Sequence, residues 1–248
     1  MEIIYSLESS KKNDLSLAKD YHESTKLHLS GINMNYCKEF QYKVYANTTK
    51  IKLVNLDSEC ENDFIKCMTN RKSTREFTTE GITLKNISYI LSLCYGLNKK
   101  SDIEFRTVPS AGARFPLELY LVVLNSIDLE QGVYHFDIKN NQLEKIKSGN
   151  YKNEIGKYCN NQDFVSNSSV VIIMTTVFER NMEKYGERGY RYILLDAGHV
   201  GQNMYLAATY LGLGAVTIGG FNDDKINQLI GVDGIDETSI YIGVVGSI

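Results

Sequence analysis

Two arginines and a serine alternate in the basic segment Arg71-Lys72-Ser73-Thr74-Arg75. In an extended chain alternate side chains point the same way, so Arg71, Ser73 and Arg75 would face one side. A planar guanidinium donates charge-assisted hydrogen bonds to phosphate oxygens, each contributing about 1.5–3 kcal/mol. Two arginines also match the charge of about −2 on a phosphate monoester. The segment therefore predicts a phosphate site, with a solvated basic turn as the alternative.

Both prolines of the chain, Pro109 and Pro116, flank a loop that begins with Ser110-Ala111-Gly112. Proline fixes φ and favours an extended residue before it, so this loop is held in shape at both ends. Its small residues leave a rigid path against which a flat ring or a sugar-alcohol chain can lie. An ordinary loop that enters a strand is the alternative.

The pair Gly219-Gly220 directly follows a short apolar stretch that is typical of a strand. Glycine at such a point allows bare backbone N–H groups to approach a ligand closely. A plain turn remains the alternative for this pair.

Lys184-Tyr185 opens a dense run of polar residues that continues to Asn203, and it precedes a long predicted helix. A lysine near a tyrosine can polarise the phenol, which makes it usable as a general base or acid. Inside the helix, Asp196 and Asn203 share a face with His199. A histidine in that position is more often the structural partner of an acid than a catalyst.

The elements that must position these motifs are interleaved helices and strands. The apolar run 117–124 is typical of a central strand, and the hairpin-like region 132–147 argues against a purely parallel sheet. Thr83 is a suitable N-cap and Gly96 a suitable stop for one helix. We expect helices at about 15–27, 61–68, 84–95, 188–211 and 223–230, and strands at 117–124, 132–136, 142–147, 169–177, 215–218 and 240–245.

Composition excludes several classes of protein. The chain has 248 residues and a formal charge of −3, which gives no electrostatic reason to expect nucleic acid. No stretch approaches the roughly 20 apolar residues of a membrane helix, and the N-terminus has no signal-peptide pattern. Five scattered cysteines without a Cys-x-x-Cys pair disfavour a disulfide framework and a zinc site, so no metal is expected. We expect a cytoplasmic protein.

Motifs for a Rossmann nicotinamide site, a Gly-x-Ser-x-Gly elbow and a His-Glu-x-x-His metal helix are all absent from the sequence.

Four motifs in series resemble the nitroreductase family, and within it the SagB/ThcOx-type dehydrogenases. The resemblance extends over residues 70–247, with weaker similarity at Tyr21-His22-Glu23 and Tyr42-Lys43. The strand segment 132–137 also resembles a hairpin of the subgroup. The four motifs are Arg71-Lys72-Ser73-Thr74-Arg75-Glu76-Phe77, Arg106-Thr107-Val108-Pro109-Ser110-Ala111-Gly112-Ala113, Lys184-Tyr185 through Asn203, and Ile218-Gly219-Gly220-Phe221.

This resemblance implies an α+β, nitroreductase-like fold with a mixed, mostly antiparallel central sheet flanked by helices. It also implies a homodimer that binds FMN at its interface through residues of both subunits. We expect residues 1–60 to form an N-terminal helical extension and residues 61–248 to form the FMN-binding domain.

The resemblance also assigns roles to individual residues. The basic segment would hold the phosphate and ribityl end of FMN, the proline loop would line the flavin, and the glycine pair would approach the ring edge that exchanges hydride. The matching stretch in azoline-oxidising relatives supplies a Lys-Tyr catalytic base. Many nitroreductases add basic phosphate contacts in a C-terminal segment, whereas this sequence ends Gly246-Ser247-Ile248, so we expect more dependence on the basic segment. The residues concerned are Arg71, Lys72, Ser73 and Arg75; Pro109, Ser110, Ala111 and Gly112; Gly219 and Gly220; and the pair Lys184 and Tyr185.

The function implied is oxidation of azolines, or of a similar small or peptide substrate, with proton loss to Tyr185 or a neighbour and hydride transfer to the flavin. Recognition of a modified peptide would need a partner, for example within a peptide-modifying complex. The alternatives are an NAD(P)H-dependent nitro or quinone reductase, a BluB-like flavin-processing protein, and a non-catalytic flavin-binding subunit.

Overall fold

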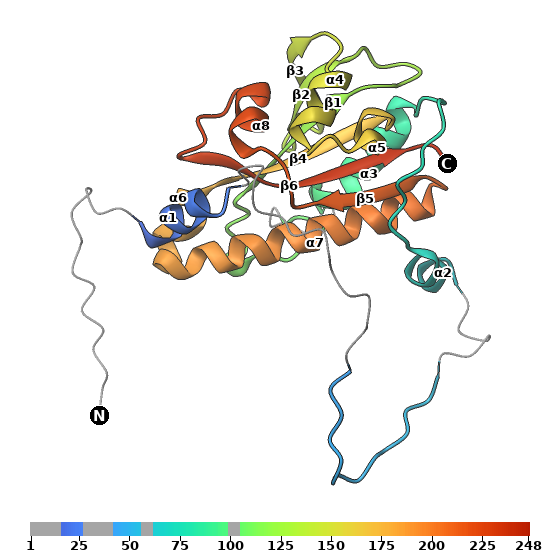
Figure 1. The fold of residues 1–248 in the computed structure, drawn as a ribbon, viewed down its shortest axis with the longest axis vertical. Helices are drawn as coiled ribbons and strands as arrows, with labels where there is room; N and C mark the ends of the chain where they lie inside the picture. The colour runs from blue at the N-terminus through green and yellow to red at the C-terminus, as the bar shows by residue number, and fades with distance from the viewer. Residues whose placement is uncertain (1–15, 27–41, 56–61, 99–104) are drawn as a thin grey trace.

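The computed structural model describes residues 16–26, 42–55, 62–98 and 105–248 (Figure 1). Its centre is a six-stranded sheet of order β3-β2-β1-β4-β6-β5, and every neighbouring pair of these strands is antiparallel. Within the described ranges, parallel pairing occurs only as isolated bridges, Ser73 with Ala215 and Ile82 with Ser126. The strands are β1 (Leu117–Val123), β2 (Gly132–Asp137), β3 (Gln142–Ser148), β4 (Val170–Val177), β5 (Gly214–Ile218) and β6 (Glu237–Gly246).

Helices cover both faces of this sheet, so the fold has three layers. Apolar side chains of α3 and α7 form one core with one face of the central strands. Those of α4, α5 and α8 form a second core with the other face. The helices are α1 (Leu17–Ser24), α2 (Asp63–Asn70), α3 (Leu84–Tyr95), α4 (Lys152–Tyr158), α5 (Asp163–Ser166), α6 (Phe178–Tyr185), α7 (Gly189–Tyr210) and α8 (Asp223–Ile230), with 3₁₀ turns η2 (Ala111–Ala113) and η3 (Gly186–Arg188).

The α+β fold and the helices flanking the sheet agree with the sequence analysis, and each expected strand is present. Strand β6 begins at Glu237, three residues before the expected start. There the Thr175 hydroxyl donates to the Glu237 carboxylate at 2.6 Å, beside a register shift in β4. Helices α4, α5 and α6, which are four to eight residues long, were not predicted, and none of them has a side-chain N-cap.

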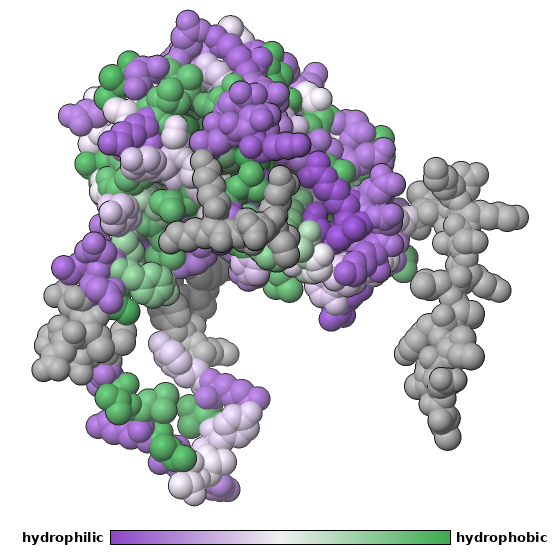
Figure 2. Space-filling view, turned by 180° about the vertical axis from the view of Figure 1, so that it is seen from behind, coloured by the Kyte–Doolittle hydropathy of each residue, from purple (hydrophilic) through white to green (hydrophobic). Residues whose placement is uncertain are grey.

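Residues 42–55 project from the body of the molecule, and apolar side chains gather on them in Figure 2. Among the described residues, no helix is both long and apolar enough to cross a bilayer.

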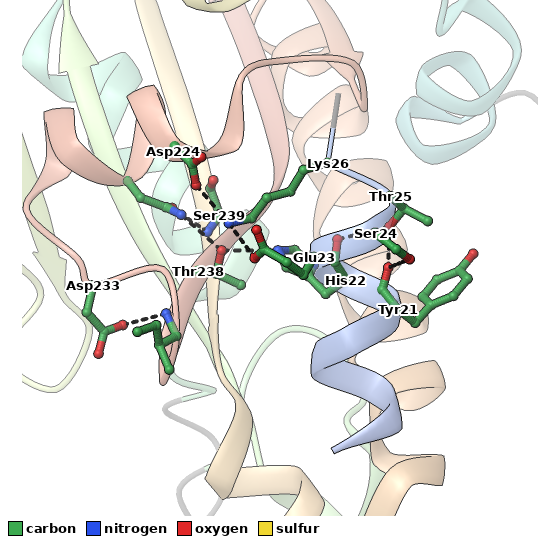
Figure 3. A network of polar contacts seen from close by, with 12 residues as sticks. Tyr21, His22, Glu23, Ser24, Thr25, Lys26, Asp224, Asp233, Thr238 and Ser239 are labelled. Carbon is green, nitrogen blue, oxygen red and sulfur yellow. Dashed lines mark hydrogen bonds and ion pairs between the residues drawn. The ribbon is translucent and has the colours of Figure 1, made fainter. Parts of the chain in front are cut away.

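Helix α1 packs on the body through a buried histidine, seen in Figure 3. The His22 ring lies 3.1 Å (Nδ1) from the Tyr190 hydroxyl and 3.2 Å (Nε2) from Thr238 Oγ1. Burial, with the charge of Lys26, lowers the pKa of His22, which favours the neutral ring. Lys26 forms ion pairs with Glu23 at 2.8 Å and Asp224 at 2.7 Å. These contacts attach α1, which is shorter than the expected helix 15–27; residues 15 and 27 lie outside the described ranges.

A second histidine, His135 on β2, lies between two carboxylates. Its Nε2 is 3.2 Å from Glu118 and its Nδ1 is 2.8 Å from Glu144. The bond with Glu118 outweighs burial and, with the bond to Glu144, raises the pKa of His135 to about 9. The protonated ring therefore stabilises the fold fully below the unfolded pKa near 6.5, and this contribution is lost as the pH rises through about 9.

We expect the His135→Gln variant to lose less stability than the wild type between pH 6 and pH 9.5, because glutamine does not titrate. Urea denaturation at several pH values measures this difference directly. A stability difference between the two proteins that stays constant over this range would contradict the assignment.

Candidate functional site

Helix α7 connects the proline loop to the core through Asp196. Ser110 Oγ donates to Asp196 Oδ2 at 2.6 Å, and the backbone N–H of Phe115 donates to Ser110 Oγ at 3.0 Å. Asp196 is only 4% exposed, and burial raises its pKa although hydrogen bonds from Ser110 and the Ala111 backbone act in the opposite direction. The loop is thus fixed to α7 by a part-buried polar contact.

The same loop contains unusual backbone geometry. Gly112 has φ +59°, which glycine adopts freely, but Ala113 at +53° and Phe115 at +45° also occupy this left-handed region. Each such non-glycine residue costs roughly 1–2 kcal/mol. The contacts of Ser110 and Asp196 therefore hold a conformation that the loop would not retain alone.

Arg106 lies beneath this loop. Its guanidinium is 5.5 Å from the ring centre of Tyr95 and 5.7 Å from that of Phe115. Within the described part of the chain, its Nε and Nη1 are buried without a hydrogen-bond partner. Arg106 belongs to the motif quoted above, but sequence reasoning gave it no role.

Lys184 and Tyr185 lie against the proline loop. A Cβ atom added to Gly112 would overlap the Tyr185 hydroxyl and would lie 2.7 Å from Lys184 Nζ. Lys184 Nζ is 5.3 Å from the centre of the Tyr185 ring, whose edge packs on Tyr192 with centroids 5.0 Å apart. The pair ends α6 and is separated from α7 by η3. The proline loop and the Lys184-Tyr185 pair, which are more than 70 residues apart in sequence, are therefore in contact.

The basic segment runs beside β5 and is joined to α7 by Tyr205. The Thr74 backbone N–H donates to the Ala215 carbonyl at 2.9 Å, and Ser73 Oγ lies 3.0 Å from the Tyr205 hydroxyl. That hydroxyl also accepts from the Thr217 backbone N–H at 2.9 Å.

The pKa of Tyr205 reflects its neighbours in the basic segment and β5. Burial raises its pKa, but hydrogen bonds with Ser73 and Thr217 and the charge of Arg71 more than offset that effect, so the pKa is lowered overall. Tyr241 extends the network by donating to Thr217 Oγ1 at 2.7 Å. Sequence reasoning missed this network, since Tyr205 lies among the apolar residues of the buried helix face.

The two arginines of the basic segment, Arg71 and Arg75, do not lie on one side as expected. Arg71 lies over the Tyr205 ring at 5.2 Å, whereas Arg75 lies 5.9 Å from the ring of Phe164 on α5, which covers the other face of the sheet. Lys72 is exposed. None of the ion pairs found among the described residues involves Arg71, Lys72 or Arg75. Their charge is therefore not neutralised by an acidic side chain there.

The glycine pair follows β5 two residues after Thr217. The position of a Cβ atom on Gly219 has no heavy atom within 4 Å, so a ligand has room at this residue. Gly220 is held through its carbonyl, which accepts from Asn160 Nδ2 at 3.0 Å. The segment combines a fixed backbone with open space.

The polar residues of α7 do not act as one face. Asp196 bonds to Ser110, His199 is exposed, and Asn203 Nδ2 donates to the carbonyls of Leu93 at 3.2 Å and Thr107 at 3.4 Å. Asn203 thus supports the start of the proline loop. Within the described residues, no group of three or more His, Cys, Asp or Glu side chains is arranged to hold a metal ion.

Comparison with known proteins adds a family match. The sequence profile of the nitroreductase family matches residues 68–247. A protein of Methanocaldococcus jannaschii that carries the name nitroreductase is 36% identical over 186 residues, which cover 75% of this chain and 91% of the relative.

Two further relatives carry names of peptide-processing proteins. The trifolitoxin-processing protein TfxB of Rhizobium leguminosarum bv. trifolii is 37% identical over 113 residues, covering 44% of this chain and 30% of the relative. The microcin B17-processing protein McbC of Escherichia coli is 28% identical over 136 residues, covering 52% of this chain and 49% of the relative. The match thus spans less than half the length of both relatives.

Solved structures give the same fold. A crystal structure assigned as a nitroreductase of Anabaena variabilis has 32% identity and a TM-score of 0.67, covering 75% of this chain and 38% of that one. A chain of the E. coli microcin synthetase McbBCD complex with truncated pro-MccB17 bound has a TM-score of 0.72, covering 96% of this chain and 99% of that one. Its identity is 19%, so this likeness concerns the fold alone.

The contact between Gly112 and Tyr185 predicts a coupling between two substitutions. Gly112→Ala should destabilise the protein more than Gly231→Ala, a matched control with φ +87° and no heavy atom near its Cβ position. Adding Tyr185→Ala should restore part of the unfolding free energy that Gly112→Ala removes, and none of that removed by Gly231→Ala. The interaction energy between Gly112→Ala and Tyr185→Ala should be about 0.5–3 kcal/mol. A double-mutant cycle by urea denaturation measures this, and additive effects would show that the residues do not touch.

The Tyr205 network predicts that Tyr205→Phe destabilises the fold by about 1–3 kcal/mol, because the part-buried Thr217 N–H loses its acceptor. Tyr210→Phe, on the same helix but 62% exposed, should change the free energy of unfolding by less than about 0.5 kcal/mol. Equal effects of the two substitutions on denaturation would refute a supporting role for the Tyr205 hydroxyl.

Proposed function

The chain belongs to the nitroreductase family, and from that premise we propose that it is an FMN-dependent oxidoreductase of the SagB/ThcOx type. The proposal rests on one observation above all. Lys184 and Tyr185, the pair expected to move a proton, lie directly against Gly112 in the loop expected to line the flavin. A candidate proton acceptor and a candidate cofactor surface are thereby side by side.

The residues present fit FMN. Arg71 and Ser73 lie together beside Tyr205 and would contact the phosphate there, whereas Lys72 is exposed and Arg75 lies over Phe164, so these two cations would have to reorient to join them. The loop from Pro109 to Gly112 would line the ring system, since Ser110 and Asp196 hold its backbone in place. Gly219, with open space at its Cβ position, and Gly220 would present their backbone to the ring edge.

Bound FMN would supply a two-electron acceptor that takes hydride from a substrate carbon. This chain would supply the proton acceptor, the phenolate oxygen of Tyr185, which would become the hydroxyl at the surface of the proline loop as it takes the substrate proton. The Lys184 ammonium lies 5.3 Å from the centre of the Tyr185 ring, so both side chains are at the same surface of the loop. The Tyr185 and Tyr192 rings pack at nearly right angles with centroids 5.0 Å apart, and the Tyr185 hydroxyl lies against Gly112 of the loop.

Azolines, or a similar small or peptide substrate, are the substrates we propose. Similarity to a trifolitoxin-processing protein and a microcin B17-processing protein supports a peptide substrate and a place in a peptide-modifying complex. A second candidate is an NAD(P)H-dependent nitro or quinone reductase. It is favoured by the relative named nitroreductase, which this chain matches over 91% of that protein's length.

We further propose a homodimer with FMN at its interface. Helix α7 leaves Leu195 61% and Tyr210 62% exposed to solvent. Beside it, a cavity of about 410 Å³ is lined by Phe64, Leu93 and Leu206 among others. Exposed apolar surface of this kind marks an interaction site.

The test begins with the purified protein, which should be yellow and carry FMN. Incubation with a thiazoline peptide should yield the aromatic azole, whereas NADPH should not bleach the flavin rapidly. Tyr185→Phe should slow azole formation at least about 100-fold, the usual contribution of a general base, without loss of FMN. Tyr89→Phe on the exposed side of α3 is the matched control and should keep full activity.

The outcomes separate the alternatives. A colourless protein that binds no added FMN would refute the flavin proposal. Rapid bleaching by NADPH without azole formation favours the reductase, and breakdown of FMN itself would indicate a BluB-like activity. A yellow protein inert in all three assays would be a non-catalytic flavin-binding subunit. Undiminished azoline oxidation by Tyr185→Phe would remove that hydroxyl from the mechanism.

A further inference from the structure

Arg114 directly follows the 3₁₀ turn of the proline loop, and its side chain reaches across to α6. Its Nε donates to the Arg180 carbonyl at 2.6 Å, and its Nη2 pairs with the Glu183 carboxylate. Within the described part of the chain, both hydrogen bonds between residues 110–115 and α6 come from this one guanidinium. Arg114 is therefore the polar link between the loop and the helix that ends in the Lys184-Tyr185 pair.

Both contacts lie in the part of α6 that leads into Lys184 and Tyr185. Glu183 directly precedes the pair, and the Arg180 carbonyl is the acceptor that the α-helical pattern assigns to the backbone N–H of Lys184. The guanidinium is a planar, rigid fork, so its two donors restrain both groups at once. The position of the last turn of α6 relative to the loop therefore depends on Arg114.

The backbone on both sides of Arg114 has a conformation that needs support. Ala113 at φ +53° and Phe115 at φ +45° are in the left-handed region, whereas Arg114 itself has φ −84° and ψ −24°. Strained residues of this kind persist only where the surrounding contacts over-determine the conformation. The bonds of Arg114 to α6 are such contacts, and the bond between Ser110 and Asp196 is another.

The space between the loop and α6 is not filled by side chains on this side. A cavity of about 480 Å³ lies there, and its lining includes Ala113 and Arg114 from the loop and Glu179 and Glu183 from the helix. Packing alone therefore does not set the spacing between the two segments at this point. Arg114 spans the gap between them through its two bonds.

The other side of α6 is fixed on the sheet through the Arg180 side chain. Its Nη1 lies 2.5 Å from Glu118 Oε1 on β1, and Glu118 Oε2 lies 3.2 Å from His135 Nε2. Although burial raises the pKa of Glu118, the hydrogen bond with His135 and the charge of Arg180 lower that pKa overall. The ionised carboxylate thus holds α6 on the sheet, while Arg114 connects the same helix to the loop.

We propose that Arg114 is a positioning residue, which holds the end of α6 so that the Tyr185 oxygen stays against Gly112 at the proposed flavin surface. In this role Arg114 touches neither substrate nor cofactor and acts through Tyr185. The catalytic consequence rests on the proposed function and deepens it, because it names the residue that keeps the proton acceptor beside the loop.

The first experiment reads the position of Tyr185 without cofactor or turnover. One fluorotyrosine is placed at position 185 of the full chain freed of FMN, and its fluorine NMR resonance is recorded. Arg114→Gln should shift this resonance toward its value in the unfolded protein, and Arg114→Lys, which keeps the charge but not the fork, should shift it less in the same direction. A resonance that both variants leave unchanged would overturn the proposal.

A matched control is Lys145→Gln, which removes the pair of Lys145 with Glu130 on the β2–β3 hairpin. The Lys145 side chain is 36% exposed and that of Arg114 is 34% exposed, so both substitutions remove an ion pair of similar exposure. Lys145→Gln should leave the fluorine resonance in place. An equal shift in the control would show that the resonance follows general loosening of the fold, and it would overturn the role of Arg114. Circular dichroism identifies a variant that does not fold, in which case Arg114→Lys carries the comparison.

The second experiment measures azole formation by the yellow protein. Arg114→Gln should lower kcat about 10- to 100-fold, as for a misplaced catalytic group, with FMN content unchanged and KM changed less than about threefold. In a Tyr185→Phe background the same substitution should lower the remaining rate less than about twofold, because Arg114 acts through Tyr185. An equal fold loss in both backgrounds would show a general structural effect and would overturn the proposal.

The two experiments separate this inference from the proposed function. A wild-type protein that is inactive on thiazoline peptides would refute the proposed function, while the fluorine resonance would still decide whether Arg114 positions Tyr185. Normal azole formation by the wild type together with an undiminished kcat in Arg114→Gln would overturn the role of Arg114 and leave the proposed function intact.

Discussion

Two buried polar side chains on α7 hold the candidate site together. Asp196 accepts from Ser110 and fixes the proline loop, and Tyr205 joins Ser73 of the basic segment to the backbone of Thr217 on β5. Both sit on a helix whose apolar face is part of the main core, so their positions are set by packing. Segments far apart in sequence thus depend on one rigid element. A site built in this way tolerates strained loop geometry, because burial of α7 supplies the stability.

Because the site depends on contacts between α7 and distant segments, only part of it could be predicted from the sequence. Apolar runs predicted β1 and β4, and apolar residues at steps of three or four predicted α7. The N-cap Thr83 and the stop Gly96 predicted the ends of α3 correctly. The family was also recognised correctly from the order of four motifs. Tyr205 escaped notice because nothing local distinguishes a tyrosine that packs from one whose hydroxyl bridges two segments. The direction of Arg75 was missed for a similar reason, since its contact with Phe164 depends on how α5 packs.

The proposed chemistry and the proposed assembly meet on α7. One side of the helix carries the contacts that shape the site, while the other leaves Leu195 and Tyr210 exposed. If the open side is a subunit interface, then dimerisation and site formation share a single helix. The roles assigned to Lys184 and Tyr185 depend less on the dimer, because their contact with Gly112 lies within one chain.

Hydrogen–deuterium exchange with and without FMN tests the location of the site most directly. If the account is right, added FMN slows exchange together in three separate regions: residues 71–75, the loop 109–113 and the turn at 219–220. Because α7 joins these regions, protection should also extend to the 184–190 segment at its start. Protection confined to other parts of the chain, or no change in these three regions despite bound FMN, would contradict the account.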